Sequence, residues 1–187
     1  MPTLTVVAGA NGCGKTTLTR WGRDEFQESS VLDPDTVARS LRSTGADSGS
    51  AIDAGREVLL MAERLLKAGQ SFAVETTLSG NTYLRMMVKA KMLGYLVVLV
   101  YIGTENVSIN MQRVRFRVAN GGHNVPEEDQ RRRYPRSIAN AAKALTIADE
   151  AIILDNSGAR YVKVAVKRIT GIEVFEPVPE WAAWLRT

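Results

Sequence analysis

"TVVAGANGCGKTTLTR" (Thr5 to Arg20) contains the strongest structural signal in this sequence. It begins within an apolar run, Thr3 to Ala8, whose β-branched residues are typical of a short buried strand. Three closely spaced glycines then interrupt the run, and a lysine and two threonines follow them. From Thr16 to Phe26 the pattern predicts a helix. The stretch therefore predicts a strand, a glycine-rich loop and a helix in immediate succession.

The loop has the spacing G-x4-G-K-T of a phosphate-binding P-loop. In such a loop the backbone N–H groups surround a phosphate chain, the lysine reaches the β- and γ-phosphate oxygens, and the threonine hydroxyl binds Mg²⁺. The N-terminus of the following helix adds the positive end of its dipole. We therefore predict that a nucleotide binds here with Mg²⁺, in contact with Gly9, Ala10, Asn11, Gly12, Cys13, Gly14, Lys15, Thr16 and Thr17.

Composition indicates one globular domain. The chain has 187 residues, of which 45% are hydrophobic, enough for a sizeable core. Its longest apolar run, "YLVVLVYIG" (Tyr95 to Gly103), is too short to cross a bilayer. The N-terminus lacks the basic segment of a signal peptide, and the single cysteine, Cys13, fits a reducing compartment. We expect a cytoplasmic protein without a membrane partner.

The net charge of +4 is concentrated in one segment. Seven arginines and three acidic residues lie between Arg113 and Arg136, and the rest of the chain is neutral overall. A generally basic surface would favour nucleic acid as a partner. A local arginine cluster in a nucleotide-binding protein instead favours a clamp for phosphates. We therefore expect no nucleic-acid partner.

Strands and helices alternate along the chain, which is typical of an α/β protein with a parallel sheet covered on both faces. We expect five parallel strands, at Thr3–Ala8, Ser30–Leu32, Ser71–Val74, Tyr95–Tyr101 and Ala151–Leu154. The predicted helices are Thr16–Phe26, Ala51–Lys67, Asn81–Leu93, Glu105–Asn120 and Pro126–Ala148. The segment from Tyr161 to Pro177 alternates around Thr170-Gly171 and predicts an antiparallel hairpin.

Polar residues follow three of these strands, at the sheet edge where ligands collect in such folds. They are Asp33 and Asp35, then Glu75, Thr76 and Thr77, and finally Asp155 and Asn156. A carboxylate beside phosphates either holds Mg²⁺ or takes a proton from an attacking hydroxyl. For Asp33 and Asp35, capping of a turn or helix beside a proline is the alternative. Glu75 has the stronger functional case, because a buried acid needs a partner.

The arginine-rich segment predicts a helical lid spanning residues 105–148. Arg113 and Arg117 are four residues apart and share a helix face. Gly121 and Gly122 then break the helix, and a second helix carries Arg132. Two arginine-bearing helices joined by glycines are typical of a lid that closes over phosphates. A solvated basic face is the alternative, and the lone histidine, His123, has no partner at metal-ligand spacing.

Taken together, these motifs resemble the zeta toxin family of P-loop kinases. The closer likeness is to its short single-domain bacterial branch, often labelled predicted ABC-type ATPases. The resemblance extends over nearly the whole chain and is carried by "GANGCGKTT", "DPD", "GRE", "SFAVETTLSG", "GGHNVPEEDQRRRYPRS" and "DNSG", in that order. It implies an ATP- and Mg²⁺-dependent kinase that phosphorylates a sugar hydroxyl of a nucleotide sugar such as UDP-N-acetylglucosamine. It also makes an antitoxin protein a candidate partner.

The resemblance implies a role for individual residues. Asp35 would be the general base, Lys15 would act on the transferred phosphate, and Arg113 or Arg117 would be the charge-stabilising lid arginine. The family's second lid arginine falls near His123, so a neighbouring arginine has to substitute for it. The metal candidates are Thr16, Asp33 and Glu75. The acceptor candidates are Asp35, Arg56, Glu75, Thr76, Thr77 and Arg132, and Asn156 is a further nucleotide candidate.

Two other functions remain open at this point. A nucleotide hydrolase or switch would need no second-substrate acid such as Asp35. A polynucleotide kinase would need basic and aromatic residues spread along a groove, which the neutral remainder of the chain disfavours. A transport ATPase is excluded. "LSGNTY" (Leu78 to Tyr83) resembles an ABC signature, but it follows Glu75 directly, and the next strand has no acid at its tip.

Overall fold

Seven strands form one sheet, in the order β2-β3-β1-β4-β5-β6-β7. We describe it from a computed structural model that covers residues 1–21, 30–33 and 51–186. The first five strands are parallel, and β6 and β7 run antiparallel to their neighbours. Their bounds are β1 Thr3–Ala8, β2 Ser30–Leu32, β3 Phe72–Thr76, β4 Leu96–Gly103, β5 Glu150–Asp155, β6 Val162–Arg168 and β7 Gly171–Val174. The predicted α/β class and the C-terminal hairpin are confirmed.

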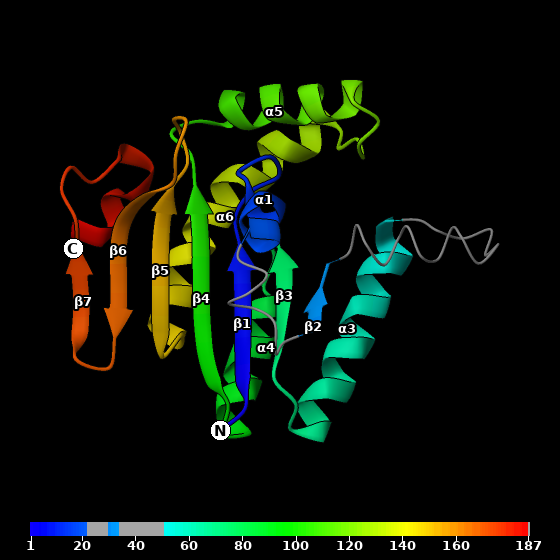
Figure 1. Cartoon of the computed structure of the whole chain (residues 1–187), viewed down its shortest axis with the longest axis vertical. Helices are drawn as coiled ribbons and strands as arrows, with labels where there is room; N and C mark the ends of the chain where they lie inside the picture. Colours follow the sequence, from blue (N-terminus) through cyan, green and yellow to red (C-terminus); the bar gives the residue numbers. More distant parts are fainter. Residues whose placement is uncertain (22–29, 34–50, 187) are drawn as a thin grey trace.

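The helices connect the parallel strands, as Figure 1 shows. Their bounds are α1 Lys15–Trp21, α3 Ala51–Ala68, α4 Thr82–Met92, α5 Val107–Ala119 and α6 Glu127–Ile147, and a final 3-10 helix, η1, spans Glu180–Arg186. The ends of the predicted helices agree to within two residues, except that residues 22–26 of the first one lie outside the described part of the chain. No described helix is long and apolar enough to cross a membrane.

Three strands extend further than predicted at their carboxyl ends. The sequence prediction ended β3 at Val74, where the apolar run stops, but pairing with β1 continues through Glu75 and Thr76. In the same way β4 and β5 pair as far as Gly103 and Asp155. The polar side chains therefore sit on the last rungs of the sheet, which fixes their backbone more firmly than a loop would.

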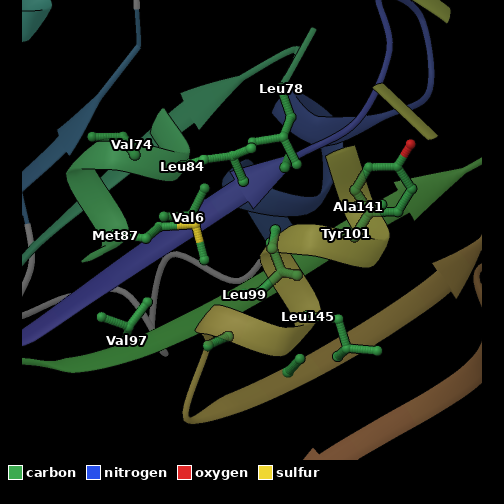
Figure 2. Packing of buried hydrophobic residues seen from close by; sticks show 14 of the residues in the cluster. Val6, Val74, Leu78, Leu84, Met87, Val97, Leu99, Tyr101, Ala141 and Leu145 are labelled. Carbon is green, nitrogen blue, oxygen red and sulfur yellow. The ribbon is translucent and has the colours of Figure 1, made fainter. Parts of the chain in front are cut away.

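The main core lies between one face of the sheet and helices α4 and α6, with α3 packed beside β2 and β3. In-register residues Leu4, Phe72 and Val97 are fully buried in it. Figure 2 shows the same face further along the strands, with Met87 from α4 and Ala141 from α6 against the sheet. Burial of both faces explains why these strands read as continuous apolar runs.

A smaller cluster lies on the opposite face, around the start of α1. Its buried strand residues are Val7, Val100, Ile102 and Leu154, with Cys13 from the loop and Leu18 from α1 packed on them. Through the buried side chain of Cys13, this cluster anchors the P-loop to the sheet. Helix α5 crosses above the carboxyl ends of the strands in Figure 1, next to the same loop. The fold therefore brings the glycine-rich loop, α1 and α5 together at one edge of the sheet.

Candidate active site

The P-loop has a backbone that only glycine adopts comfortably. Gly9, Gly12 and Gly14 have φ angles of 147°, 79° and 110°. A Cβ on Gly9 would overlap with the carbonyl of Ile102, and one on Gly12 would overlap with the carbonyl of Asn110. The loop therefore needs glycine both for its backbone angles and for its close approach to β4 and α5. These features fit a loop whose N–H groups surround a phosphate chain.

Lys15 lies over this loop. Its Nζ donates hydrogen bonds to the carbonyl oxygens of Gly9 (2.7 Å) and Ala10 (3.1 Å) and lies 3.9 Å from the Cys13 sulfur. The ammonium group is thus already positioned at the concave side of the loop. Cys13 itself is fully buried, and burial raises the pKa of its thiol despite the nearby Lys15 charge. Its thiol is therefore a packing group rather than a reactive one.

The first turn of α1 is joined to β3 through a buried carboxylate. Thr16 Oγ1 donates to Glu75 Oε2 (3.1 Å) and Thr19 Oγ1 donates to Glu75 Oε1 (2.5 Å). Glu75 is only 4% exposed. Burial raises the pKa of its carboxyl, the hydrogen bond from Thr19 opposes this, and the negative charge of Asp33 adds to the rise. An acid held this way is costly to ionise, so it gains from a nearby cation.

The oxygen donors at this point fit a Mg²⁺ ion. Thr16 supplies a hydroxyl, Glu75 a carboxylate, and Asp33 lies close enough to Glu75 to influence its pKa. Mg²⁺ usually binds through one or two carboxylates, waters and substrate phosphates rather than through a complete protein cage. Thr16 and Glu75 therefore fit a Mg²⁺ ion that is shared with the phosphates of a nucleotide.

The loop after β5 braces the P-loop from the other side. Asn156 Nδ2 donates to the carbonyl of Cys13 (2.8 Å), and the Tyr161 hydroxyl donates to the carbonyl of Gly14 (2.9 Å). A Cβ on Gly14 would overlap with both side chains. Asn156, predicted as a nucleotide contact, thus fixes the loop's backbone with one of its amide hydrogens. The predicted contact between Asn156 and a nucleotide stays a prediction.

Arg113 and Arg117 share a helix but have different partners. Arg113 donates from Nη1 to the carbonyl of Asn156 (2.7 Å) and from Nη2 to the carbonyl of Gly158 (3.1 Å). Its positive charge is close enough to Cys13 to oppose the rise in the thiol pKa that burial causes. Arg117 instead donates to the carbonyl of His123 (2.7 Å) in the loop between α5 and α6. Only Arg113 is therefore brought to the P-loop in this conformation.

The remaining predicted site residues are spread more widely. Thr76 is buried beside the P-loop, where the Gly9 amide donates to its carbonyl (3.2 Å), and Thr77 follows it. Arg132 forms an exposed ion pair with Asp129, and Arg56 is exposed on α3. Asp35 lies outside the described residues. The structure therefore gathers Lys15, Thr16, Glu75, Thr76 and Arg113, with Asp33 electrostatically coupled to Glu75.

Asp155 has a structural role. Its Oδ1 accepts hydrogen bonds from the Ser157 hydroxyl (2.7 Å) and from the indole N–H of Trp181 (2.7 Å). The Ser157 hydroxyl in turn accepts a hydrogen bond from the backbone amide of Glu105 (2.7 Å). Sequence reasoning placed Asp155 with the acids around the phosphate site and missed Trp181. The tryptophan gave no signal because it follows the acid by 26 residues, in the C-terminal helix.

Sequence reasoning also missed Thr19 and Tyr161. Thr19 lies one helical turn after Thr16, and this spacing places both hydroxyls on the side of α1 that faces β3. The three-residue spacing from Thr16 could therefore have identified Thr19 as a second hydroxyl near Glu75. Tyr161 is 147 residues away from the loop that it braces, and nothing in the local sequence indicates this contact.

Comparisons with known proteins agree with this geometry. A family model described as zeta toxin matches residues 1–164. An uncharacterized protein of Haemophilus influenzae is 37% identical over 126 residues, which is 67% of this chain and 88% of that protein.

Two solved structures have the same fold. The crystal structure of the AvrRxo1-ORF1:-ORF2 complex with ATP has a TM-score of 0.74 and 18% identity, and covers 100% of this chain. This chain spans only 62% of the length of that one. The structure of the PezAT chromosomal toxin-antitoxin system of Streptococcus pneumoniae has a TM-score of 0.62 and 20% identity over 89% of this chain and 72% of its own. Because the family model extends over most of the sequence, the chain belongs to the zeta toxin family of P-loop kinase-like proteins.

Proposed function

We propose that the protein is an ATP- and Mg²⁺-dependent kinase that transfers the γ-phosphate to a hydroxyl of a nucleotide sugar such as UDP-N-acetylglucosamine. The observation that carries the proposal is the link between Thr16 of the P-loop and the buried Glu75. A hydroxyl and a carboxylate at the end of neighbouring elements are the donors that a nucleotide-bound Mg²⁺ requires. Family membership supports the same activity, and one solved relative carries ATP.

The proposed roles follow from the chemistry of phosphoryl transfer. The acceptor oxygen forms a bond to the γ-phosphorus while the bond to the bridging oxygen breaks, and ADP leaves with that oxygen. Lys15 stabilises the negative charge that develops on the transferred group, because its ammonium lies over the loop. Mg²⁺ held by Thr16, Glu75 and Asp33 would neutralise phosphate oxygens. Asp35, whose role rests on the family pattern alone, would take the acceptor's proton.

Arg113 is the proposed charge-stabilising arginine. Its guanidinium is held beside the P-loop by the carbonyls of Asn156 and Gly158, and these two bonds use two of the five N–H donors of an arginine. Arg117 and Arg132 would join it if the region 105–148 moves as a lid within the single domain 1–187. On the acceptor side, Glu75, Thr76 and Thr77 line the end of β3, and Arg56 stays a positional candidate.

The proposal extends to partners and location. Both solved relatives are two-protein assemblies by name, and one of them is a toxin-antitoxin system. An antitoxin protein is therefore among the proposed partners. Because ATP and nucleotide sugars are metabolites of the cytoplasm, the proposal includes a cytoplasmic location.

The test is acceptor dependence. The purified protein is incubated with ATP and Mg²⁺, with and without UDP-N-acetylglucosamine, and ADP and phosphorylated sugar are measured by mass spectrometry. We expect ADP formation to rise with the acceptor and to match the phosphosugar formed. If this acceptor is inert, a metabolite extract replaces it and the phosphorylated species is identified. ADP formation that no acceptor alters would instead establish a nucleotide hydrolase.

Two carboxylate variants separate the proposed roles. Asp35→Asn should keep nucleotide affinity, since the P-loop contacts remain, and lose phosphotransfer by about 10²–10⁴, the usual contribution of a general base. Asp33→Asn should weaken the Mg²⁺ dependence instead. Nucleotide binding is measured by calorimetry for both variants. Normal transfer by Asp35→Asn would remove the general base from the proposal.

A further inference from the structure

The turn after β3 contains a strained residue. Leu78 has a φ angle of 54°, the positive value that leucine rarely adopts, and it is the only non-glycine residue in the described part of the chain with such an angle. A side chain in this left-handed region costs roughly 1–2 kcal/mol. Such a conformation persists only when its surroundings hold it, and it is found most often at functional sites.

Asn140 of helix α6 is the residue that holds this turn. Its Nδ2 donates a hydrogen bond to the carbonyl of Leu78 (2.9 Å) and lies within bonding distance of the carbonyl of Gly80 (3.4 Å). The Thr76 hydroxyl accepts a bond from the Leu78 amide (3.0 Å). The Leu78 side chain is fully buried and points into the core in Figure 2. Both backbone groups and the side chain of Leu78 are thus fixed.

The same turn borders the phosphate site. The amide of Gly9, the first P-loop glycine, donates a hydrogen bond to the carbonyl of Thr76. Glu75, the proposed metal ligand, directly precedes Thr76 in the chain. Beyond Thr76, the hydroxyls of Thr77 and Ser79 are hydrogen-bonded to each other at 3.0 Å and are half-buried. The turn therefore presents two hydroxyls next to the loop that holds the phosphates.

We propose that Asn140 is a positioning residue for the phosphate acceptor, acting through the turn of residues 76–80. Asn140 holds Leu78 in its strained conformation and thereby fixes the backbone of the turn. The fixed backbone orients the hydroxyls of Thr77 and Ser79 toward a polyhydroxylated acceptor such as a sugar. The inference rests on the kinase activity proposed above. It adds that α6 controls acceptor binding through a buried amide, whereas nucleotide binding depends on the P-loop.

The test uses Asn140→Leu, which has nearly the same shape but no donor, and Asn140→Ala, which removes the donor together with volume. A matched control is Ser137→Ala, since Ser137 is fully buried on the same helix and bonds to the Tyr101 hydroxyl (3.1 Å), away from the turn. For each protein KM and kcat are measured for ATP and for the acceptor. Hydrogen exchange of peptides containing residues 76–80 is followed in parallel.

Both Asn140 variants should raise the acceptor KM by about tenfold, the effect of leaving a buried carbonyl unsatisfied, while the ATP KM changes by less than about twofold. Exchange in residues 76–80 should accelerate and exchange in the P-loop should not. Ser137→Ala should leave both readouts unchanged. The use of two variants of different volume guards against a single misfolded protein.

Three results would overturn the proposal. The first is an unchanged acceptor KM in both Asn140 variants. The second is an equal effect on ATP and acceptor, and the third is an equal effect in Ser137→Ala, because either would indicate general destabilisation. If the wild type shows no acceptor-dependent transfer, the kinase function fails and the acceptor role fails with it. The exchange measurement then still decides whether Asn140 holds the turn.

Discussion

Thr16 Oγ1 lies 3.1 Å from Glu75 Oε2, which joins the P-loop helix directly to a buried carboxylate on β3. The second carboxylate oxygen accepts from Thr19 (2.5 Å), so within the described part of the chain both oxygens are hydrogen-bonded by neutral hydroxyls. Two neutral donors compensate a buried negative charge only in part, which agrees with the raised pKa of Glu75. The positive charge of Lys15 also lowers the pKa of Glu75, but it does not cancel the rise that burial causes.

This arrangement predicts opposite effects on stability and activity for Glu75→Gln. The variant removes the buried charge and keeps the shape, so without nucleotide its melting temperature should rise by about 2–4 °C, equivalent to roughly 1 kcal/mol. Phosphotransfer and stabilisation by Mg²⁺–nucleotide should both fall sharply. Thermal unfolding with and without ligand measures this. A lower melting temperature for the free variant would show that the charge is already compensated.

Lys15→Ala should abolish nucleotide-dependent turnover while the fold survives. Lys15 Nζ bonds to the carbonyls of loop residues Gly9 and Ala10, so its loss chiefly removes a charge from the phosphate site. A rate loss of roughly 10²–10³ is expected, by analogy with the removal of one donor from an oxyanion site. Lys143→Ala, an exposed lysine on α6, is the control. Normal turnover by Lys15→Ala would contradict the phosphate-loop assignment.

Trp181→Phe should reduce kcat through the loop after β5. The variant keeps an aromatic ring against Gly103 but loses the N–H donated to Asp155, which also binds Ser157. Since that loop holds Arg113, we expect kcat to fall about three- to tenfold, with a change of about 1 kcal/mol or less in the free energy of unfolding.

A variant of the same helix controls for packing. Trp184→Phe replaces an indole that packs against the main core cluster, and it should leave kcat unchanged. Trp181 lies beyond the residues that the zeta toxin model matches, so an effect on kcat would show that the C-terminal segment contributes to the site. Equal kcat values for the two tryptophan variants would argue against such a contribution.

The fold was predictable because its signals are local. The P-loop spacing and the alternation of apolar runs with helical segments predicted strands β1 to β5 and helices α1 and α3 to α6, with differences of at most two residues at the ends that the structure describes. The strand ends were the main error, because Glu75 and Thr76 interrupt the apolar pattern while their backbones continue to pair with β1. Hydrophobicity indicates where side chains are buried and does not report where backbone pairing ends.

The supporting residues of the site were not predictable, because their contacts are distant in sequence. Asn140 and Leu78 are 62 residues apart, and Tyr161 and Gly14 are 147 apart. A leucine also carries no indication that its φ angle is positive. Catalytic candidates such as Lys15 occur in recognisable motifs. The residues that position them are set by tertiary packing, which a single sequence does not encode locally.

Asp149→Asn should reduce stability in a pH-dependent way. Burial raises the pKa of Asp149, but the hydrogen bonds from Lys91 (2.6 Å) and from the Val97 amide (2.9 Å) outweigh it, so the pKa lies below its ordinary value of 3.8. A lowered pKa in the folded state means that the stabilisation is present above pH 3.8 and is lost as the pH falls through the folded-state value.

The wild type should therefore exceed Asp149→Asn by about 1–2 kcal/mol in the free energy of unfolding at pH 7, as expected for hydrogen bonds to a charged group. The difference should shrink below pH 3.8. Urea unfolding at several pH values measures it. Glu63→Gln, which breaks an exposed pair with Lys89, should give a much smaller change. A difference that grows on acidification would contradict the assignment.

Helix α5 of the proposed lid is attached to the rest of the protein more tightly in its first half than in its second. Its first half is docked, because the backbone of Asn110 lies against Gly12 and Arg113 bonds to Asn156 and Gly158. Its second half is more open. Phe116 is 75% exposed, and the helix ends at Ala119, just before Gly121, whose φ of 80° marks the turn toward α6.

We therefore expect hydrogen exchange to divide the lid at about Arg113. Without ligand, amides from Asn110 to Arg113 should exchange slowly and those of residues 116–126 quickly. An ATP analogue with Mg²⁺ should protect the second group, because phosphate oxygens neutralise the mutual repulsion of the arginines when the segment closes. Most of α6 after Ser137 should not change, since Ala141 and Ala144 are fully buried in the core.

Lys15→Ala provides the matched control, since a protein with weakened phosphate binding should lose the ligand-induced protection and keep the slow exchange near Asn110. Uniform protection of all of α5 would mean that the whole helix moves as one lid. Unchanged exchange in residues 116–126 on nucleotide binding would show that the arginine-rich segment is an ordinary charged surface. In that case Arg113, held beside the P-loop by backbone carbonyls, would be the one arginine of α5 retained in the proposed site.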